Sequence, residues 1–289
     1  MWCNGGSRRE GGVGAEGGCQ RGVGRAKERG VSLSTPLPSE TGGRWHVVVA
    51  GATGLVGRAL VAALALRSDV RVVALTRSAG RAPLPAEVEE AVFDYDDESS
   101  YRRLGRELPC DVLYCCLGTT LKAAGSDEAF RRVDLEYPRR LFARAATLLQ
   151  RPAVGLVSSV GADRPQGLYL ETKAEAEVAL VASGLPYVIV RPSLLLGERS
   201  ESRPAERAAQ LAFGPLGRAV RAVLPSSGVV RYVPVEAGRV AAALIHFTID
   251  RPGPPAWVVE GPALFAPAAF VPPGAALAPA PARAGGEGG

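Results

Sequence analysis

The chain of 289 residues has few of the residues on which several functions depend. It contains only two histidines, His46 at the start of a predicted strand and His246 in a late predicted helix. We therefore expect neither a metal centre nor a histidine-based catalytic triad. A membrane-spanning helix needs roughly 18 apolar residues without a charge, and no apolar run in the sequence is that long, so no membrane span is expected.

Both ends of the chain lack the large apolar groups that form a core. Residues 1–43 are rich in glycine and arginine, and they contain no apolar segment of the kind found in secretory signals. Residues 262–289 are mostly proline, alanine and glycine, and so many prolines interrupt a helix. We predict two disordered tails around a single folded domain at 44–261, which is long enough to bury a complete core.

Charge and cysteine content argue against nucleic-acid binding and against secretion. The net charge is +5, but Asp134 and Glu136 interrupt the most arginine-rich helix, so a track for a phosphate backbone is not expected. The five cysteines include the vicinal pair Cys115 and Cys116 in an apolar run. Buried thiols of this kind indicate a reducing, cytoplasmic environment instead of a disulfide framework.

The segment 47–64 combines a valine run, a glycine turn and an amphipathic helix. Its spacing, G-x-x-G-x-x-G, is typical of a dinucleotide-binding turn. Gly51 permits a tight turn, Gly54 lets the backbone approach a pyrophosphate, and Gly57 lets the helix pack closely on the strand. A glycine-rich turn without a ligand is the alternative. The free N–H groups at the helix start favour phosphate binding, and the predicted contacts are Gly51, Thr53, Gly54, Leu55, Val56 and Gly57.

Strand-like apolar runs alternate with helical patterns along the predicted domain. This alternation predicts an α/β fold, a Rossmann-type doubly wound parallel sheet with ligands at the carboxyl ends of its strands. The expected strands are 45–50, 70–76, 89–93, 111–117, 153–159 and 186–191, and the expected helices are 55–67, 97–107, 127–150, 170–184, 204–213, 215–223 and 236–250.

The ends of the second and third predicted strands indicate which nucleotide is bound. A site that prefers NAD usually has an acidic residue about 20 positions after the glycine turn, but Arg77 stands there. Arg77 can hold a 2′-phosphate, which predicts NADPH, or it can be a solvated arginine. Asp94 follows the third strand, where it either accepts a hydrogen bond from the adenine amino group or caps the next helix.

Three polar residues near the ends of later strands supply the chemistry of a reductase. Tyr169 and Lys173 are four residues apart, which places them on one face of a helix. A nearby ammonium stabilises a tyrosinate, and Ser159 can orient a carbonyl oxygen. The chain has only three lysines, so this pair is not expected by chance. The fourth strand brings Leu117, Gly118 and Thr119 to the cofactor side.

The motifs GATGLVG, SSVGAD and YLETK resemble those of atypical short-chain dehydrogenases/reductases. CCLGTTLKAAGSDEAFRRVDLEY and RPSLLLGERSESRPAE resemble more narrowly the Tat-interacting-protein branch of oxidoreductases. The resemblance covers about residues 45–250. It implies bound NADPH, a Ser159–Tyr169–Lys173 site, and a loop beginning at Arg191 and Pro192 over the nicotinamide and substrate.

We expect an NADP(H)-binding oxidoreductase that transfers a hydride to or from a small carbonyl or alcohol substrate. A non-catalytic regulator is the main alternative, in which NADPH binding sets the conformation of a surface for a protein partner. Members of the resembled branch are known as regulators. A sugar-nucleotide epimerase or dehydratase ranks third, because only about 70 residues follow Arg191 before the predicted tail.

Overall fold

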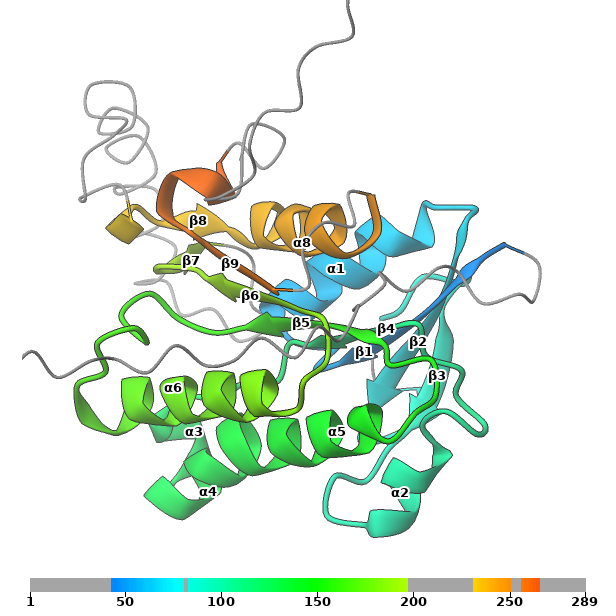
Figure 1. Ribbon diagram of the computed structural model, residues 1–289, viewed down its shortest axis with the longest axis horizontal. Coiled ribbons are helices and arrows are strands. Elements are labelled where there is room, and N and C mark those ends of the chain that lie inside the picture. Colours follow the sequence, from blue (N-terminus) through cyan, green and yellow to red (C-terminus); the bar gives the residue numbers. More distant parts are fainter. Residues whose placement is uncertain (1–42, 81–82, 197–230, 251–255, 266–289) are drawn as a thin grey trace, which may run out of the picture. The chain divides into compact units, whose positions relative to one another are not determined.

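A computed structural model of the protein describes residues 43–80, 83–196, 231–250 and 256–265 (Figure 1). These residues all belong to one compact unit of the chain. The two predicted tails fall almost wholly outside the described residues, as do the helices predicted at 204–213 and 215–223. Among the described helices, none is long and apolar enough to cross a membrane.

The centre of the fold is a seven-stranded sheet in which every neighbouring pair of strands is parallel. The strand order is β3-β2-β1-β4-β5-β6-β9, so the order reverses between β1 and β4. This is the predicted doubly wound arrangement, in which ligands bind beyond the carboxyl ends of the strands at that switch point. The strands are β1 (Trp45–Ala50), β2 (Val70–Thr76), β3 (Glu89–Val92), β4 (Val112–Cys115), β5 (Ala153–Val157), β6 (Tyr187–Arg191) and β9 (Ala256–Glu260).

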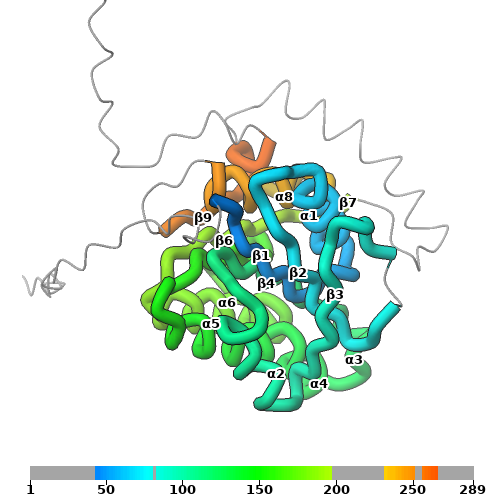
Figure 2. The backbone as a smooth tube through the Cα atoms, turned by 90° about the vertical axis from the view of Figure 1, so that its right-hand side faces the viewer, coloured from blue at the N-terminus to red at the C-terminus, as the bar shows by residue number. Residues whose placement is uncertain are grey.

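Helices cover both faces of the sheet, which explains why the central strands β4 and β5 are buried along their whole length. Alternate residues of β1 enter two separate cores, Val47 on one face and Val48 on the other. Helices α1 and α8 close the first core, and α2, α5 and α6 close the second (Figures 1 and 2). The helices are α1 (Leu55–Ala65), α2 (Glu98–Arg103), α3 (Leu121–Ala124), α4 (Asp127–Arg131), α5 (Tyr137–Ala146), α6 (Gly167–Ala182) and α8 (Ala237–Ile245).

The helix predicted at 127–150 is divided in the structure. A π-helical turn, η1 (Arg132–Glu136), separates α4 from α5, and a second one, η3 (His246–Asp250), ends α8. π-Helical turns inside α-helices are frequent at functional sites because they redirect one side chain. The turn η1 carries Asp134, which is 2% exposed.

Several short elements have no counterpart in the sequence prediction. The strand β9 extends the sheet beyond β6, and β7 (Leu195–Leu196) pairs with β8 (Val235–Glu236) in a separate two-stranded sheet. A 3₁₀ helix, η4 (Gly261–Leu264), follows β9, and its Leu264 is 2% exposed within the core around α1 and α8. Packed structure therefore continues past residue 261, where the prediction ended the domain.

Candidate cofactor and active site

The glycine turn after β1 is shaped by two very close backbone approaches. Gly51 has a φ of +78°, and a Cβ atom there would lie 2.5 Å from the carbonyl oxygen of Cys116. A Cβ on Gly57 would lie 2.1 Å from the carbonyl oxygen of Gly51. Real Cβ atoms do not come this close, so both positions need glycine. The turn consequently holds the first helix directly against the ends of β1 and β4.

The start of α1 is open toward the solvent. Gly54 is the residue that precedes the helix, with extended backbone angles, and no acidic side chain lies in the first turn. Gly54 and Thr53 are exposed. The N–H groups and positive dipole end of α1 are therefore available to an anion, as in sites for nucleotide phosphates.

A cavity of about 700 Å³ runs from this turn to the start of α6. It is large enough for most of a dinucleotide, and binding pockets of this kind have volumes of about 300–1,000 Å³. Nine of the predicted site residues line it: Thr53, Gly54, Leu55, Val56, Leu117, Gly118, Thr119, Tyr169 and Lys173. Seven do not: Gly51, Gly57, Arg77, Asp94, Ser159, Arg191 and Pro192.

Lys173 is held by a carboxylate that the sequence analysis did not place in the site. Its Nζ lies 2.7 Å from Oδ1 of Asp134, and both side chains are buried. The other oxygen, Oδ2, accepts a hydrogen bond of 2.8 Å from the backbone N–H of Thr119. A Cβ on Gly118 would lie 3.6 Å from the Lys173 Nζ, so the lack of a side chain there leaves room beside the ion pair. Asp134 thus links α6 to the strand end at β4.

The Asp134 carboxylate also controls the charge of Lys173. Burial alone lowers the pKa of Lys173, but the negative charge of Asp134 and the neighbouring Tyr169 outweigh burial and raise it above its ordinary value of 10.5. Lys173 is therefore a stable cation at neutral pH, beside the exposed phenol of Tyr169. Tyr169 and Lys173 line the same cavity, and Asp134 offsets part of the positive charge of Lys173.

Substitution of Asp134 by asparagine should destabilise the protein most near neutral pH. We expect a loss of about 1.5 kcal/mol, because a buried hydrogen bond to a charged group is weakened while the ammonium stays buried. Without the carboxylate, burial lowers the pKa of Lys173 in the folded variant. The folded variant then binds fewer protons than its unfolded state, so its stability recovers as the pH rises toward 10.5.

Urea denaturation of wild type and Asp134→Asn between pH 6 and 10 measures this effect. The difference in unfolding free energy should shrink with rising pH. The exposed Asp96 provides a matched control, since Asp96→Asn removes the same charge at the surface and should change little. A deficit that is constant over the whole range would contradict the proposed coupling between the two residues.

The two serines after β5 face different surroundings. Ser158 is 4% exposed and lines the cavity, and its hydroxyl donates a hydrogen bond to Oε1 of Glu177. Ser159, the predicted catalytic serine, is half-buried and does not line the cavity. Its hydroxyl has only a long contact, 3.4 Å, to the carbonyl oxygen of Val160. The structure therefore brings the neighbour of the predicted serine to the cavity.

Arg191 and Pro192 lie next to the cavity lining and not in it. The guanidinium of Arg191 donates to both carboxylate oxygens of Glu177, at 2.9 and 2.6 Å. Glu177 raises the pKa of Arg191, although burial acts in the opposite direction. Pro192 is buried and its carbonyl oxygen accepts a hydrogen bond of 2.9 Å from the N–H of Val160. Among the described residues that follow, Leu195 reaches the cavity.

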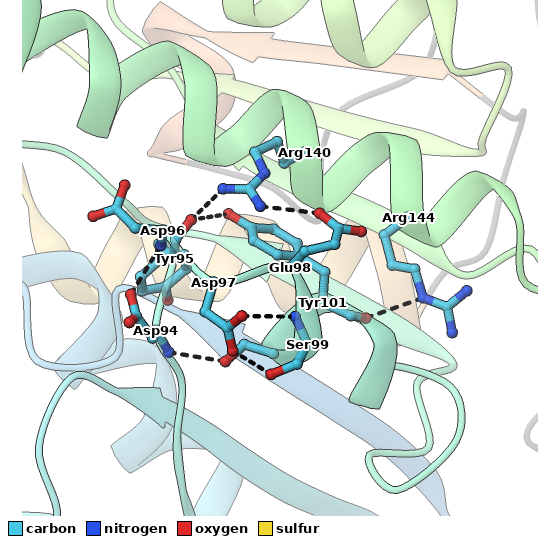
Figure 3. Close-up of polar contacts among 10 residues, drawn as sticks. Asp94, Tyr95, Asp96, Asp97, Glu98, Ser99, Tyr101, Arg140 and Arg144 are labelled. Atoms are coloured by element: carbon cyan, nitrogen blue, oxygen red, sulfur yellow. Dashed lines mark hydrogen bonds and ion pairs between the residues drawn. The ribbon is translucent and has the colours of Figure 1, made fainter.

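The predicted adenosine side of the site is at the ends of β2 and β3. Arg77 is exposed there. Asp94 does not cap helix α2, because Asp97 does so by accepting a hydrogen bond from the N–H of Ser99 (Figure 3). The carboxylate of Asp94 instead accepts a hydrogen bond of 2.9 Å from the N–H of Asp96, and the side chain of Asp94 remains exposed. The capping alternative for Asp94 is wrong, and the adenine contact stays a prediction.

Tyr95 lies beneath the glycine turn and was not predicted as part of the site. It is 5% exposed and stacks on Tyr137, with ring centroids 5.2 Å apart. Burial raises the pKa of Tyr95. The carbonyl oxygen of Tyr95 accepts two hydrogen bonds, one of 2.9 Å from the hydroxyl of Tyr101 and one of 2.6 Å from the guanidinium of Arg140 (Figure 3). These contacts join the loop after β3 to α2 and α5.

The arginines of the predicted helix at 127–150 hold the fold together. Arg140 stacks over the ring of Tyr101 at 4.1 Å and pairs with Glu98 at 3.0 Å. Arg144 donates to the carbonyl oxygen of Tyr101, and Arg131 pairs with Glu175. Figure 3 shows the contact of Arg140 with Glu98 and that of Arg144 with Tyr101. These arginine side chains are engaged with acidic residues and backbone carbonyls, so they contribute to the packing of the fold and are not simply the solvated face that the sequence predicted.

The histidines and cysteines also have structural surroundings. The ring Nδ1 of His46 lies 3.2 Å from Asp111 at the opposite end of β1 from the glycine turn. The three described cysteines are free, and burial raises the pKa of Cys115 to about 12. A thiol with such a pKa is protonated and unreactive at neutral pH. No group of three potential metal ligands occurs within the described residues.

Comparisons with known proteins agree with this geometry. A family model described as NAD(P)H-binding matches residues 51–214. Protein HTATIP2 of Rattus norvegicus is 36% identical over 177 residues, which cover 59% of this chain and 71% of the rat protein. Protein fmp52-1, mitochondrial, of Aspergillus terreus is 34% identical over 178 residues, which cover 60% of this chain and 76% of the fungal protein.

Solved structures show the same fold at low identity. The Bordetella bronchiseptica enzyme WbmF, in complex with NAD+, has a TM-score of 0.55 at 19% identity, covering 75% of each chain. The Thermus thermophilus UDP-glucose 4-epimerase, in complex with NAD, has a TM-score of 0.54 at 20% identity, covering 70% of this chain and 74% of the epimerase.

The parallel sheet, the glycine turn at its switch point and the adjoining cavity define a protein with a Rossmann-type nucleotide-binding fold. The chain belongs to the NAD(P)H-binding family, as an atypical short-chain dehydrogenase/reductase similar to HTATIP2.

Proposed function

We propose that the protein is an NADP(H)-dependent oxidoreductase that reduces a small carbonyl compound or oxidises the corresponding alcohol. The observation that carries this proposal is that Tyr169 and Lys173 line the same cavity as the glycine turn. A proton donor and its neighbouring cation thus face the space that a dinucleotide would fill. A glycine turn alone would support only binding.

The residues of the cavity fit the bound cofactor. The backbone at Gly54 and the start of α1 would hold the phosphates, because the glycine leaves its N–H groups uncovered. Lys173 and the backbone at Gly118 would lie beside the ribose of the nicotinamide. When bound, NADPH supplies the hydride that reduces the carbonyl carbon.

The protein side of the reaction is a proton transfer from Tyr169 to the carbonyl oxygen. Lys173 stabilises the tyrosinate that remains, and Asp134 fixes the position of the ammonium through an ion pair of 2.7 Å. Ser159 would orient the carbonyl oxygen, which requires that its hydroxyl turn toward the cavity from its place in the loop. Tyr169 is 39% exposed, so a substrate can reach it.

Titration with NADPH and NADH tests the cofactor assignment. Arg77 is exposed at the end of β2, and a contact between its guanidinium and a 2′-phosphate should give about ten- to hundredfold tighter binding of NADPH. Isothermal calorimetry measures both dissociation constants. Arg77→Asp should narrow or reverse the preference, whereas Arg102→Asp, an equal change of charge on exposed α2, should leave it unchanged. Equal affinities in the wild type would overturn the assignment to NADPH.

We also propose that the protein acts in the cytoplasm, which the free thiols of the described cysteines support. The fungal relatives carry the word mitochondrial in their names. Imaging of the tagged full-length chain against a mitochondrial marker distinguishes the two compartments.

A further inference from the structure

A buried chain of hydrogen bonds lies beside the reaction end of the cavity, and the proposed proton transfer does not use it. Ser158 lines the cavity and donates to Glu177. Glu177 is 6% exposed and lies one turn after Lys173 on α6. Its two oxygens also accept from Nε and Nη2 of Arg191. The side chains of Ser158, Glu177 and Arg191 therefore hold one another in place at the wall of the cavity.

The direction of these hydrogen bonds follows from the chemistry of the three groups. A guanidinium can only donate, so the Glu177 carboxylate must accept from Arg191 with both oxygens. Arg191 is additionally 3.6 Å from Glu260, and this second carboxylate holds the cation where it is. The carboxylate can likewise only accept from Ser158. The single hydroxyl hydrogen of Ser158 is therefore committed to Glu177, and its lone pairs remain for the cavity.

An acceptor at this position cannot polarise a carbonyl oxygen, because that oxygen is an acceptor too. Ser158 needs a ligand that presents an N–H or O–H group. The hydroxyl of an alcohol substrate must face Tyr169, which exchanges its proton, so it is not available to Ser158. At the reaction end of a bound dinucleotide, the donors are the hydroxyl groups of the nicotinamide ribose, which would lie beside Lys173 and Gly118 in the proposed complex, and the amide NH₂ of the nicotinamide ring. The NH₂ group is the donor that those two residues leave for Ser158.

We propose that Ser158 recognises the carboxamide of the nicotinamide as a hydrogen-bond acceptor, and that Glu177 is the positioning residue that fixes the direction of its hydroxyl. This inference rests on the proposed function, because it presupposes a bound nicotinamide dinucleotide. A contact of this kind limits rotation of the ring about its bond to the ribose. Ser158 would thereby help to select which face of the ring meets the substrate.

Equilibrium binding of NADP+ and its 3-acetylpyridine analogue tests the proposal without any turnover. The analogue replaces the NH₂ by a methyl group and so cannot donate. The wild type should bind NADP+ about tenfold more tightly than the analogue, as expected for one hydrogen bond in a buried site. Ser158→Ala should bring the ratio close to one, chiefly by weakening NADP+. Ser183→Ala, at the far end of α6, should keep the wild-type ratio.

Glu177→Gln provides a second test, whose expected result would not follow if Glu177 had a purely structural role. The glutamine amide can donate to Ser158, which frees the serine hydrogen to point into the cavity. The variant should then favour the acetyl analogue more than Ser158→Ala does. If this variant does not fold, Ser158→Ala alone decides the matter, since it leaves the pair between Glu177 and Arg191 intact.

The outcomes separate this inference from the proposed function. If the wild type binds neither nucleotide, the proposed function is wrong and the inference falls with it. If both nucleotides bind and Ser158→Ala keeps the tenfold ratio, only the role of Ser158 is wrong. A ratio of about one in the wild type would also overturn that role.

Discussion

Replacement of Gly57 by alanine should destabilise the protein by about 3 kcal/mol and weaken NADPH binding at the same time. The added Cβ would lie 2.1 Å from the carbonyl oxygen of Gly51 and 2.9 Å from the Cα of Ala52. These are backbone atoms, which cannot rotate away, so α1 must move off the turn. That movement shifts the N–H groups at the start of the helix, so the proposed phosphate site should be lost with the packing.

Gly238→Ala is the matched control for this substitution. Gly238 lies in the first turn of α8, and a Cβ there would meet no atom within 4 Å. Alanine favours a helix over glycine, so this variant should be as stable as the wild type or slightly more stable. Urea denaturation and calorimetry with NADPH measure both effects. A Gly57→Ala protein with the stability of the wild type would show that the turn is more adaptable than this geometry allows.

The glycine turn and the first six strands of the sheet were predictable because their signals are local. Five of these strands, β1, β2, β4, β5 and β6, are short and largely apolar runs, whereas β3 begins with two glutamates. The spacing of Gly51, Gly54 and Gly57 already implies the tight turn. The strand β9 was missed because its five residues stand in a proline-rich stretch without a helix pattern after it. Its burial on the sheet edge depends on β6, which is far away in the sequence.

The partners of the site residues were not predictable, since they arise from tertiary contacts. In the sequence, Asp134 is simply an acidic residue within an arginine-rich helix. Nothing in the sequence marks the π-helical turn that directs Asp134 to Lys173. Glu177 occurs eight residues after Tyr169 on α6, a spacing that could have placed it on the face of the Tyr–Lys pair. Its contact with Ser158 still depends on the register of β5 against that helix.

The choice between Ser158 and Ser159 shows the limit of strand patterns. Adjacent residues at a strand end point to opposite sides, so a shift of one position decides whether a side chain faces the cavity or the loop. The sequence places both serines at the end of β5 without fixing which one faces the ligand. The structure places Ser158 at the cavity and Arg191 against Glu177, where the family resemblance had assigned roles to Ser159 and Arg191.

Tyr169→Phe should reduce turnover of any carbonyl substrate found by screening by about a hundredfold or more, as expected for loss of a general acid. The substitution removes only the hydroxyl, and the ring keeps its contact with Phe130, whose centroid is 5.9 Å away. NADPH affinity should therefore hardly change. Tyr232→Phe is the matched control, because Tyr232 is exposed and does not line the cavity.

The same experiment separates the oxidoreductase from a regulatory protein that merely binds NADPH. If Tyr169→Phe retains full turnover, Tyr169 is not the acid, and the proton must come from another group or from water. If a broad panel of aldehydes and ketones shows no turnover in the wild type, while NADPH changes the affinity for a protein partner, the regulatory function is the better description. Loss of turnover with unchanged NADPH affinity supports the oxidoreductase, because a cofactor that served only to set a conformation would not need the phenolic proton.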